Sequence, residues 1–92
     1  MIKSWQHRGL KKFYETGSKS GIIASHTKRL KLILQMLNAA NTPDMLNQPG
    51  MNFHPLKGKI KGFFAVMVRA NWRVIYKFEG EDAILVDYLD YH

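Results

Sequence analysis

The chain has 92 residues, of which 46% are hydrophobic and 12% aromatic, and this suits one compact core but leaves no room for two. No apolar run approaches the roughly 20 residues of a membrane-spanning helix, and no apolar signal stretch follows the start, so we expect a cytoplasmic protein with no membrane partner. Because there are no cysteines, disulfides, zinc–thiolate sites and thiol nucleophiles are excluded.

Charge is distributed unevenly along the chain. All 14 Lys and Arg residues lie within residues 1–77 beside only Glu15 and Asp44, whereas residues 78–92 hold acids and no Lys or Arg. A basic body gains binding free energy by releasing counterions from phosphate backbones, so the pattern favours a nucleic-acid partner. The alternative is that a basic composition only aids solubility.

The first quarter of the chain predicts a short strand and a short helix. Residues 2–5 can form the strand. Leu10, Phe13 and Tyr14 then fall at helical spacing in a segment that Gly17 stops.

A longer amphipathic helix is predicted next. Ser25 is expected to cap it, and it should end within residues 38–41. A further helical turn is expected over residues 42–46, with proline in its first turn, before a break at residues 48–50. The core positions of the longer helix follow the i, i+3, i+4, i+7 pattern: Leu30, Ile33, Leu34 and Leu37.

From residue 53 onward the apolar period changes to two. Three strand candidates, rich in aromatic and branched residues, span residues 63–69, 72–78 and 83–90. The turns between them, at residues 70–71 and 79–82, predict an antiparallel meander with one apolar face and one partly polar face. The fold class is therefore α+β, an antiparallel sheet with two to three N-terminal helices packed on one face.

Four local groups carry side chains suited to phosphate chemistry: His54-Pro55-Leu56-Lys57-Gly58, Arg69, Arg73 and Asp90-Tyr91-His92. Each alone is more often a solvated or core feature, and their combination is what indicates a site. Pro55 favours an extended backbone at His54. In the basic loop that follows, Lys59 and Lys61 are best explained as a solvated hairpin tip that also attracts phosphates in a general way.

The two arginines raise a question of register. A two-residue turn pairs Arg69 with Trp72, whereas a three-residue turn pairs Arg69 with Arg73 and places both guanidinium groups on one face. Like charges opposite each other cost about 0.2 to 1 kcal/mol, so only an anionic ligand would favour the second arrangement.

The last strand runs into an acid, a phenol and an imidazole. In a regular strand Asp90 and His92 point to one face and Tyr91 to the other, whereas a twist at the strand end would gather all three around one cleft. The sequence leaves both arrangements open.

Read in order, these segments resemble the HigB branch of the RelE-like toxins. The resemblance is carried by residues 54–58, by Val68-Arg69-Ala70-Asn71-Trp72-Arg73 and by Asp87-Tyr88-Leu89-Asp90-Tyr91-His92, and it extends to the start of the chain. It implies the compact RelE-like fold, with an active cleft on the sheet face opposite the helices.

The resemblance also implies an activity. HigB-like enzymes cut messenger RNA in the A site of the 70S ribosome, with contacts to 16S ribosomal RNA, and they work without metal or other cofactor. Internal transesterification by the ribose 2′-hydroxyl leaves a 2′,3′-cyclic phosphate and a 5′-hydroxyl. The implied protein partner is a HigA-like helix-turn-helix antitoxin, which links the toxin indirectly to operator DNA.

By the same resemblance, seven residues map onto the family's active-site region: His54, Lys57, Arg69, Arg73, Asp90, Tyr91 and His92. Their chemistry agrees with the reaction, since either histidine can serve as acid or base and the cations can oppose the charge of the phosphorane. Asp90 can orient an imidazole, bond the substrate or act as a base. Tyr91 can stack on a base or position the RNA.

Two other readings compete. ParE-like toxins share this small fold and inhibit DNA gyrase, but an inhibitor of that kind has no need for clustered His, Lys, Arg and Tyr. A non-catalytic RNA- or ribosome-binding module could use Trp72 and Tyr91 for stacking, although the alternation around Trp72 places that ring in the core.

Overall fold

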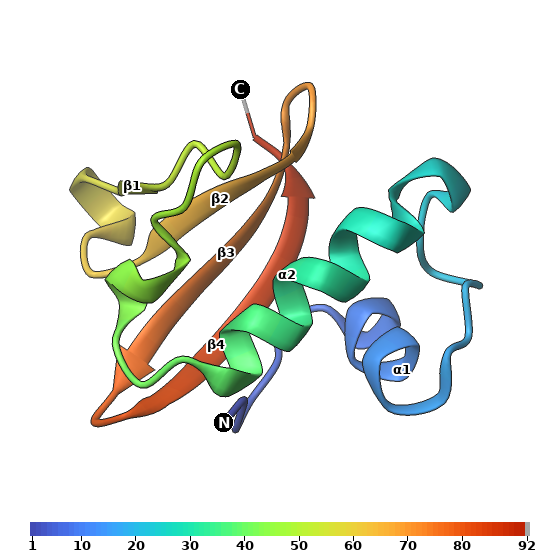
Figure 1. The fold of residues 1–92 in the computed structure, drawn as a ribbon, viewed down its shortest axis with the longest axis horizontal. Helices are drawn as coiled ribbons and strands as arrows, with labels where there is room; N and C mark the ends of the chain where they lie inside the picture. The colour runs from blue at the N-terminus through green and yellow to red at the C-terminus, as the bar shows by residue number, and fades with distance from the viewer. Residues whose placement is uncertain (92) are drawn as a thin grey trace.

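Helices from the first half of the chain cover one face of an antiparallel sheet built from the second half (Figure 1). The computed structural model describes residues 1–91. Its helices are α1 (Arg8–Thr16) and α2 (Thr27–Ala39), and its strands are β1 (His54–Pro55), β2 (Phe64–Arg69), β3 (Trp72–Glu79) and β4 (Asp82–Asp90). The sheet has the order β1-β2-β3-β4, so the predicted α+β class with a meander is confirmed. Over the described residues, no helix is both long enough and apolar enough to cross a membrane.

Helix α1 forms where the spacing of apolar residues predicts it. Leu10 and Phe13 are buried, and Gly17 ends the helix in the left-handed conformation, where its N–H donates to the Phe13 carbonyl at 2.8 Å. His7 caps the other end, because its Nδ1 accepts the Leu10 N–H at 2.9 Å.

Helix α2 confirms the predicted core stripe but not its predicted cap. Leu30, Ile33, Leu34 and Leu37 are all fully buried. Ser25 lies inside a 3-10 turn, η1 (Ala24–His26), and the helix begins only at Thr27 with no side-chain cap. The prediction for Ser25 was wrong because a capping residue needs an extended backbone, whereas here the chain enters the helix from a turn that is already wound.

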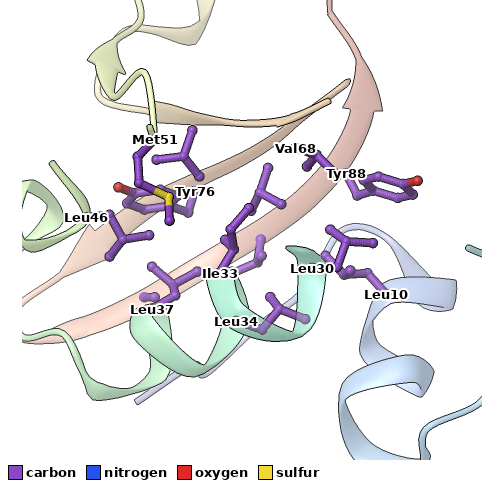
Figure 2. Close-up of a cluster of buried hydrophobic side chains, with 14 of the residues drawn as sticks. Leu10, Leu30, Ile33, Leu34, Leu37, Leu46, Met51, Val68, Tyr76 and Tyr88 are labelled. Carbon is purple, nitrogen blue, oxygen red and sulfur yellow. The ribbon is translucent and has the colours of Figure 1, made fainter. Parts of the chain in front are cut away.

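The main core lies between α2 and the sheet. Figure 2 shows Ile33 of α2 pointing toward the strands and Leu30 beside Leu10 of α1, and one cluster joins the buried residues of α2 to those of the sheet, among them Val68, Tyr76 and Tyr88. Burying each large side chain of this kind contributes about 1.5–3 kcal/mol, so this face carries most of the stability. Two further 3-10 turns, η2 (Pro43–Leu46) and η3 (Gly58–Ile60), complete the chain, and η2 adds Leu46 to the core.

The N-terminal segment protects the free edge of β4. Ile2 and Trp5 form isolated parallel bridges with Ala83 and Val86 in place of the short strand predicted over residues 2–5. The register between β3 and β4 shifts at Leu85, whose φ is 54° and whose N–H donates to the Ser4 hydroxyl at 2.8 Å. This bulge bends β4 and leaves its C-terminal end beside the β2–β3 hairpin (Figure 1).

Candidate active site

The face of the sheet opposite the helices, here called the second face, holds a smaller apolar cluster. Leu56, Ala65 and Ile75 are buried there, with Phe63 and Tyr91 partly buried against them. Cross-strand partners share a face, so the register assigns two rows of residues to it: His54, Ala65, Ile75 and Asp87, then Met67, Arg73 and Leu89. Residues 56–63 cover part of this face, and polar groups surround the cluster.

Arg73 is a half-buried cation on the second face. Its Nη1 donates to the carbonyl oxygens of Ala70 at 2.5 Å and Trp72 at 3.1 Å, which folds the guanidinium group back along the hairpin. Its Nε is buried and has no hydrogen-bond partner among the described residues. Since a buried charged donor without an acceptor is costly, this group is suited to an anion that is not part of the chain.

Tyr91 is joined to the same hairpin. Its N–H donates to the Asn71 carbonyl at 2.9 Å, and its half-buried ring packs against the apolar cluster of the second face. Ala70 has a φ of 51°, a left-handed conformation that is unusual for a residue with a side chain. The hairpin tip therefore keeps a strained conformation while Arg73 and Tyr91 both bond to it.

His54 enters the second face from β1. Its Nδ1 lies 3.0 Å from the Asn52 carbonyl oxygen. Because a carbonyl can only accept, Nδ1 carries the proton in this bond, and in the neutral ring Nε2 keeps its lone pair. The geometry thus prepares His54 to accept a proton at Nε2.

Lys57 lies directly after Leu56, whose side chain is buried in the same cluster as Tyr91. The lysine is exposed, and Gly58 follows it with a φ of 73° that turns the chain into η3. Lys59 and Lys61 are exposed in and after this turn. Lys77 adds a fourth lysine, with its Nζ 5.7 Å from the centre of the Phe63 ring.

Arg69 and Asp90 lie differently from the other candidates. The hairpin takes the two-residue turn, so Arg69 pairs with Trp72 while Arg73 pairs with Met67, and the two arginines do not face each other. Burial, and then the charge of Arg69, lower the pKa of His26, a residue of the helical layer. Asp90 pairs with Trp72, whose ring packs on the helical core, whereas Tyr91 packs on the second face.

The structure thus brings His54, Arg73 and Tyr91 to one face, with Lys57 at its border. Arg69 and Asp90 lie at the same end of the sheet but are directed toward the helical side. His92 lies outside the described residues. No group of three or more carboxylate or imidazole side chains among residues 1–91 is placed to hold a metal ion.

The sequence matches the model of one protein family, described as the RelE-like toxin of the type II toxin–antitoxin system HigB, over residues 3–92. The chain belongs to this family. Membership in a type II system also means that the toxin has an antitoxin partner.

Curated relatives of this HigB-like toxin cover its whole length. It is 41% identical over 92 residues to the Endoribonuclease HigB of Proteus vulgaris, and the match covers all of both chains. It is 30% identical over 94 residues to Toxin HigB-1 of Vibrio cholerae, covering all of this chain and 98% of the relative.

Solved structures support the fold of the HigB-like toxin. A YoeB/ParE toxin from Agrobacterium tumefaciens matches with a TM-score of 0.60 at 20% identity, covering 97% of this chain and 99% of that one. A variant of YafQ from Escherichia coli matches with a TM-score of 0.57 at 19% identity, covering 96% and 91%. At these identities the likeness concerns the fold alone, and it confirms the RelE-like fold.

Sequence reasoning missed two features of this toxin. Lys77 was not among the predicted site residues, although the period of two in this strand places it on the same face as Arg73 and Ile75. His26 was not noticed because a single histidine before an amphipathic helix forms no pattern that distinguishes it from a surface residue.

Proposed function

We propose that the chain is an endoribonuclease that cleaves messenger RNA in the ribosomal A site by attack of the ribose 2′-hydroxyl on the adjacent phosphate. The endoribonuclease named among its relatives, 41% identical over the full length, supports the activity. The observation that carries the proposal is the buried, unpartnered Nε of Arg73 on a face shared with His54 and Tyr91.

Each step of the reaction has a candidate group on the second face. His54 takes the proton of the 2′-hydroxyl at Nε2, while the new P–O bond forms and negative charge grows on the phosphorane. Arg73 and Lys57 oppose that charge. The bond to the 5′-oxygen then breaks, and this oxygen gains a proton, leaving a 2′,3′-cyclic phosphate and a 5′-hydroxyl.

The remaining candidates have supporting roles. His92, next to Tyr91, supplies the proton to the 5′-oxygen, and Tyr91 stacks on a base of the substrate. Asp90 and Arg69 contact the RNA or orient the groups beside it. Lys59, Lys61 and Lys77 attract neighbouring phosphates.

Contacts with 16S ribosomal RNA fit the helical side of the molecule. A cavity of about 470 Å³ lies between α1 and α2, and Lys19, Lys28 and Lys31 line it. None of these lysines pairs with an acid in the described part of the chain. Cations on two opposed faces suit a protein that RNA surrounds, as it would in a ribosomal site.

The antitoxin partner is, on this proposal, a HigA-like helix-turn-helix protein. Such a partner would connect the toxin to operator DNA without direct contact between the toxin and the DNA. A pull-down with the protein encoded by the neighbouring reading frame tests this, and a partner lacking a helix-turn-helix motif would contradict it.

The activity itself is tested with programmed ribosomes. We expect new messenger fragments that end in a 2′,3′-cyclic phosphate, and far slower cleavage of naked RNA of the same sequence, because the ribosome holds the reactive geometry. Equal cleavage rates on naked RNA and on programmed ribosomes would contradict the proposed dependence on the ribosome. Inhibition of gyrase supercoiling without any messenger cleavage would support a ParE-like inhibitor instead.

A further inference from the structure

A buried histidine joins the helical layer to the last strand, and no step proposed above uses it. His26 is 4% exposed, and its Nδ1 lies 2.6 Å from the hydroxyl oxygen of Tyr88. The two residues are 62 positions apart in the sequence. Figure 2 shows Tyr88 on β4, at the end of the core nearest α1.

The direction of this hydrogen bond follows from its surroundings. Burial, and then the charge of Arg69, lower the pKa of His26, so the ring is neutral near pH 7. Burial raises the pKa of the Tyr88 hydroxyl, against a backbone hydrogen bond from Ile23, so the phenol keeps its proton. Because the phenol oxygen already accepts the hydrogen bond from the Ile23 backbone, we assign the phenol as the donor and Nδ1 as the acceptor, with the imidazole proton on Nε2.

Aromatic contacts extend the pair to β3. The rings of Trp72 and Tyr88 lie 4.7 Å apart between centroids, and the His26 ring meets Trp72 edge-on at 5.7 Å. The ring of His7, which caps α1, meets Tyr88 at 5.3 Å. One cluster thus connects the N-terminal cap of α1, the start of α2, the first residue of β3 and the end of β4.

This cluster is adjacent in sequence to the candidate site. Trp72 pairs with Asp90 and immediately precedes Arg73. Tyr88 lies three residues before Tyr91, whose N–H bonds to the hairpin tip. The side chains of the pair face the helical core, while the backbone next to them carries residues of the second face.

We propose that His26 is a positioning residue, whose hydrogen bond to Tyr88 fixes the end of β4 and the β2–β3 hairpin in the arrangement that RNA cleavage needs. This inference rests on the proposed function. A displacement of about 1 Å at a reacting group can slow a reaction on the order of 100-fold, so a buried bond that fixes two strand ends can act on the rate without touching RNA.

The first test removes the hydroxyl of Tyr88 and compares the cleavage rate of this variant with that of a variant that lacks another buried tyrosine hydroxyl. Tyr88→Phe deletes only the hydroxyl. Tyr76→Phe is the control, because Tyr76 is also buried in the same sheet and its hydroxyl donates to the Pro43 carbonyl at 2.9 Å. We expect single-turnover cleavage on saturating programmed ribosomes to fall at least about tenfold in Tyr88→Phe and to stay at the wild-type rate in Tyr76→Phe.

Three further measurements separate positioning from general stability. Ribosome affinity should be unchanged in Tyr88→Phe. The backbone amide resonances of Asn71, Asp90 and Tyr91 should move in Tyr88→Phe but not in Tyr76→Phe. Both variants should lose melting temperature to a similar degree.

Variants of the histidine provide the second arm. His26→Asn keeps an acceptor where Nδ1 stood and should retain most of the rate, whereas His26→Leu should lose as much as Tyr88→Phe. The double variant with His26→Leu and Tyr88→Phe should be no slower than the slower single variant, because both remove one interaction.

The outcomes that overturn the proposals are distinct. Wild-type rates in folded Tyr88→Phe and His26→Leu, with an active wild-type chain, would refute the positioning role alone. So would a loss in Tyr76→Phe equal to that in Tyr88→Phe. A wild-type chain that leaves messenger RNA on ribosomes intact would refute the proposed function, and the positioning role with it.

Discussion

The two faces of the sheet differ in how completely their polar groups are satisfied. On the helical face, buried hydroxyl and imidazole groups are paired, as in Tyr88 with His26 and Tyr76 with the Pro43 carbonyl. On the second face the apolar cluster is small, and Arg73 keeps a buried Nε with no partner among the described residues. The comparison indicates that one face supplies stability and the other is arranged for a ligand.

The largest expected effect is the loss of cleavage activity when Arg73 is replaced, with Arg29 on the helical side of the sheet as the control. Arg73→Ala should slow single-turnover cleavage on programmed ribosomes by about 10² to 10³-fold, because it removes a donor to the phosphorane. Arg29 is the matched control, since its Nε donates to the Met67 carbonyl at 3.1 Å and its Nη2 to the Gly50 carbonyl at 2.6 Å.

For Arg29→Ala we expect a loss of about 1–3 kcal/mol in the free energy of unfolding and an unchanged cleavage rate. The assignment of ligand binding to the second face would be wrong if Arg73→Ala cleaved at the wild-type rate. It would also be wrong if both variants lost activity equally.

The next effect concerns stability. Leu34 of α2 is fully buried, so Leu34→Ala should lower the free energy of unfolding by about 2–5 kcal/mol. Leu89 is half-buried on the second face, and Leu89→Ala should cost less than about 2 kcal/mol. Urea denaturation measures both free energies of unfolding. A larger loss of stability in Leu89→Ala than in Leu34→Ala would contradict the assignment of the main core to the helical face.

A smaller effect is expected for the lysines between α1 and α2. Replacing Lys28 and Lys31 by glutamine should make the plot of log affinity for ribosomes against log salt concentration shallower by about 1.5, since each phosphate contact contributes about 0.7 to 0.9. Lys11→Gln, on the exposed side of α1 and outside the cavity, is the control. An unchanged slope in the double variant would exclude this groove from ribosome contact.

The smallest effect is the pH dependence caused by His26. Its pKa in the folded chain lies below the ordinary value of 6.5, through burial and then Arg69, so the unfolded chain binds the extra proton first. The resulting stability is fully present above about pH 6.5 and is lost as pH falls through the lowered pKa, with a slope of at most about 1.4 kcal/mol per pH unit.

Chemical denaturation between about pH 7.5 and 5.5 measures this slope, and the His26→Asn chain should be flatter than the wild type. Arg69 and Tyr88, the charged and titratable groups that face the ring, remain in that variant, as does His7 beside Tyr88. Equal slopes in the two chains would contradict the assignment of this dependence to His26.

The sequence predicted the elements well where periodicity is strong. The stripe from Leu30 to Leu37 was confirmed by its full burial. The period of two in β3 was confirmed because Val74 and Tyr76 pack in the main core whereas Ile75 packs in the cluster of the second face. Ser25 failed because the preference of serine for capping is local, whereas the position of a helix start depends on how the preceding turn packs.

The site was only partly predictable. Residue types and their order indicated His54, Arg73 and Tyr91, and pairing across three strands brought them to one face. Whether Arg69 faced Arg73 depended on a single residue in the turn, which no pattern fixes. The bond between His26 and Tyr88 spans 62 residues, and contacts of that range follow from the folded chain rather than from local spacing.

Photocrosslinking on the ribosome can establish whether messenger RNA binds on the second face. A photoreactive side chain is placed at Met67 on the second face or at Leu32, which is 45% exposed on α2, and each chain is bound to ribosomes carrying messenger RNA with a 2′-methoxy group at the scissile position. We expect crosslinks to the A-site codon from position 67 and none from position 32. Crosslinks to that codon from position 32 alone would contradict this expectation.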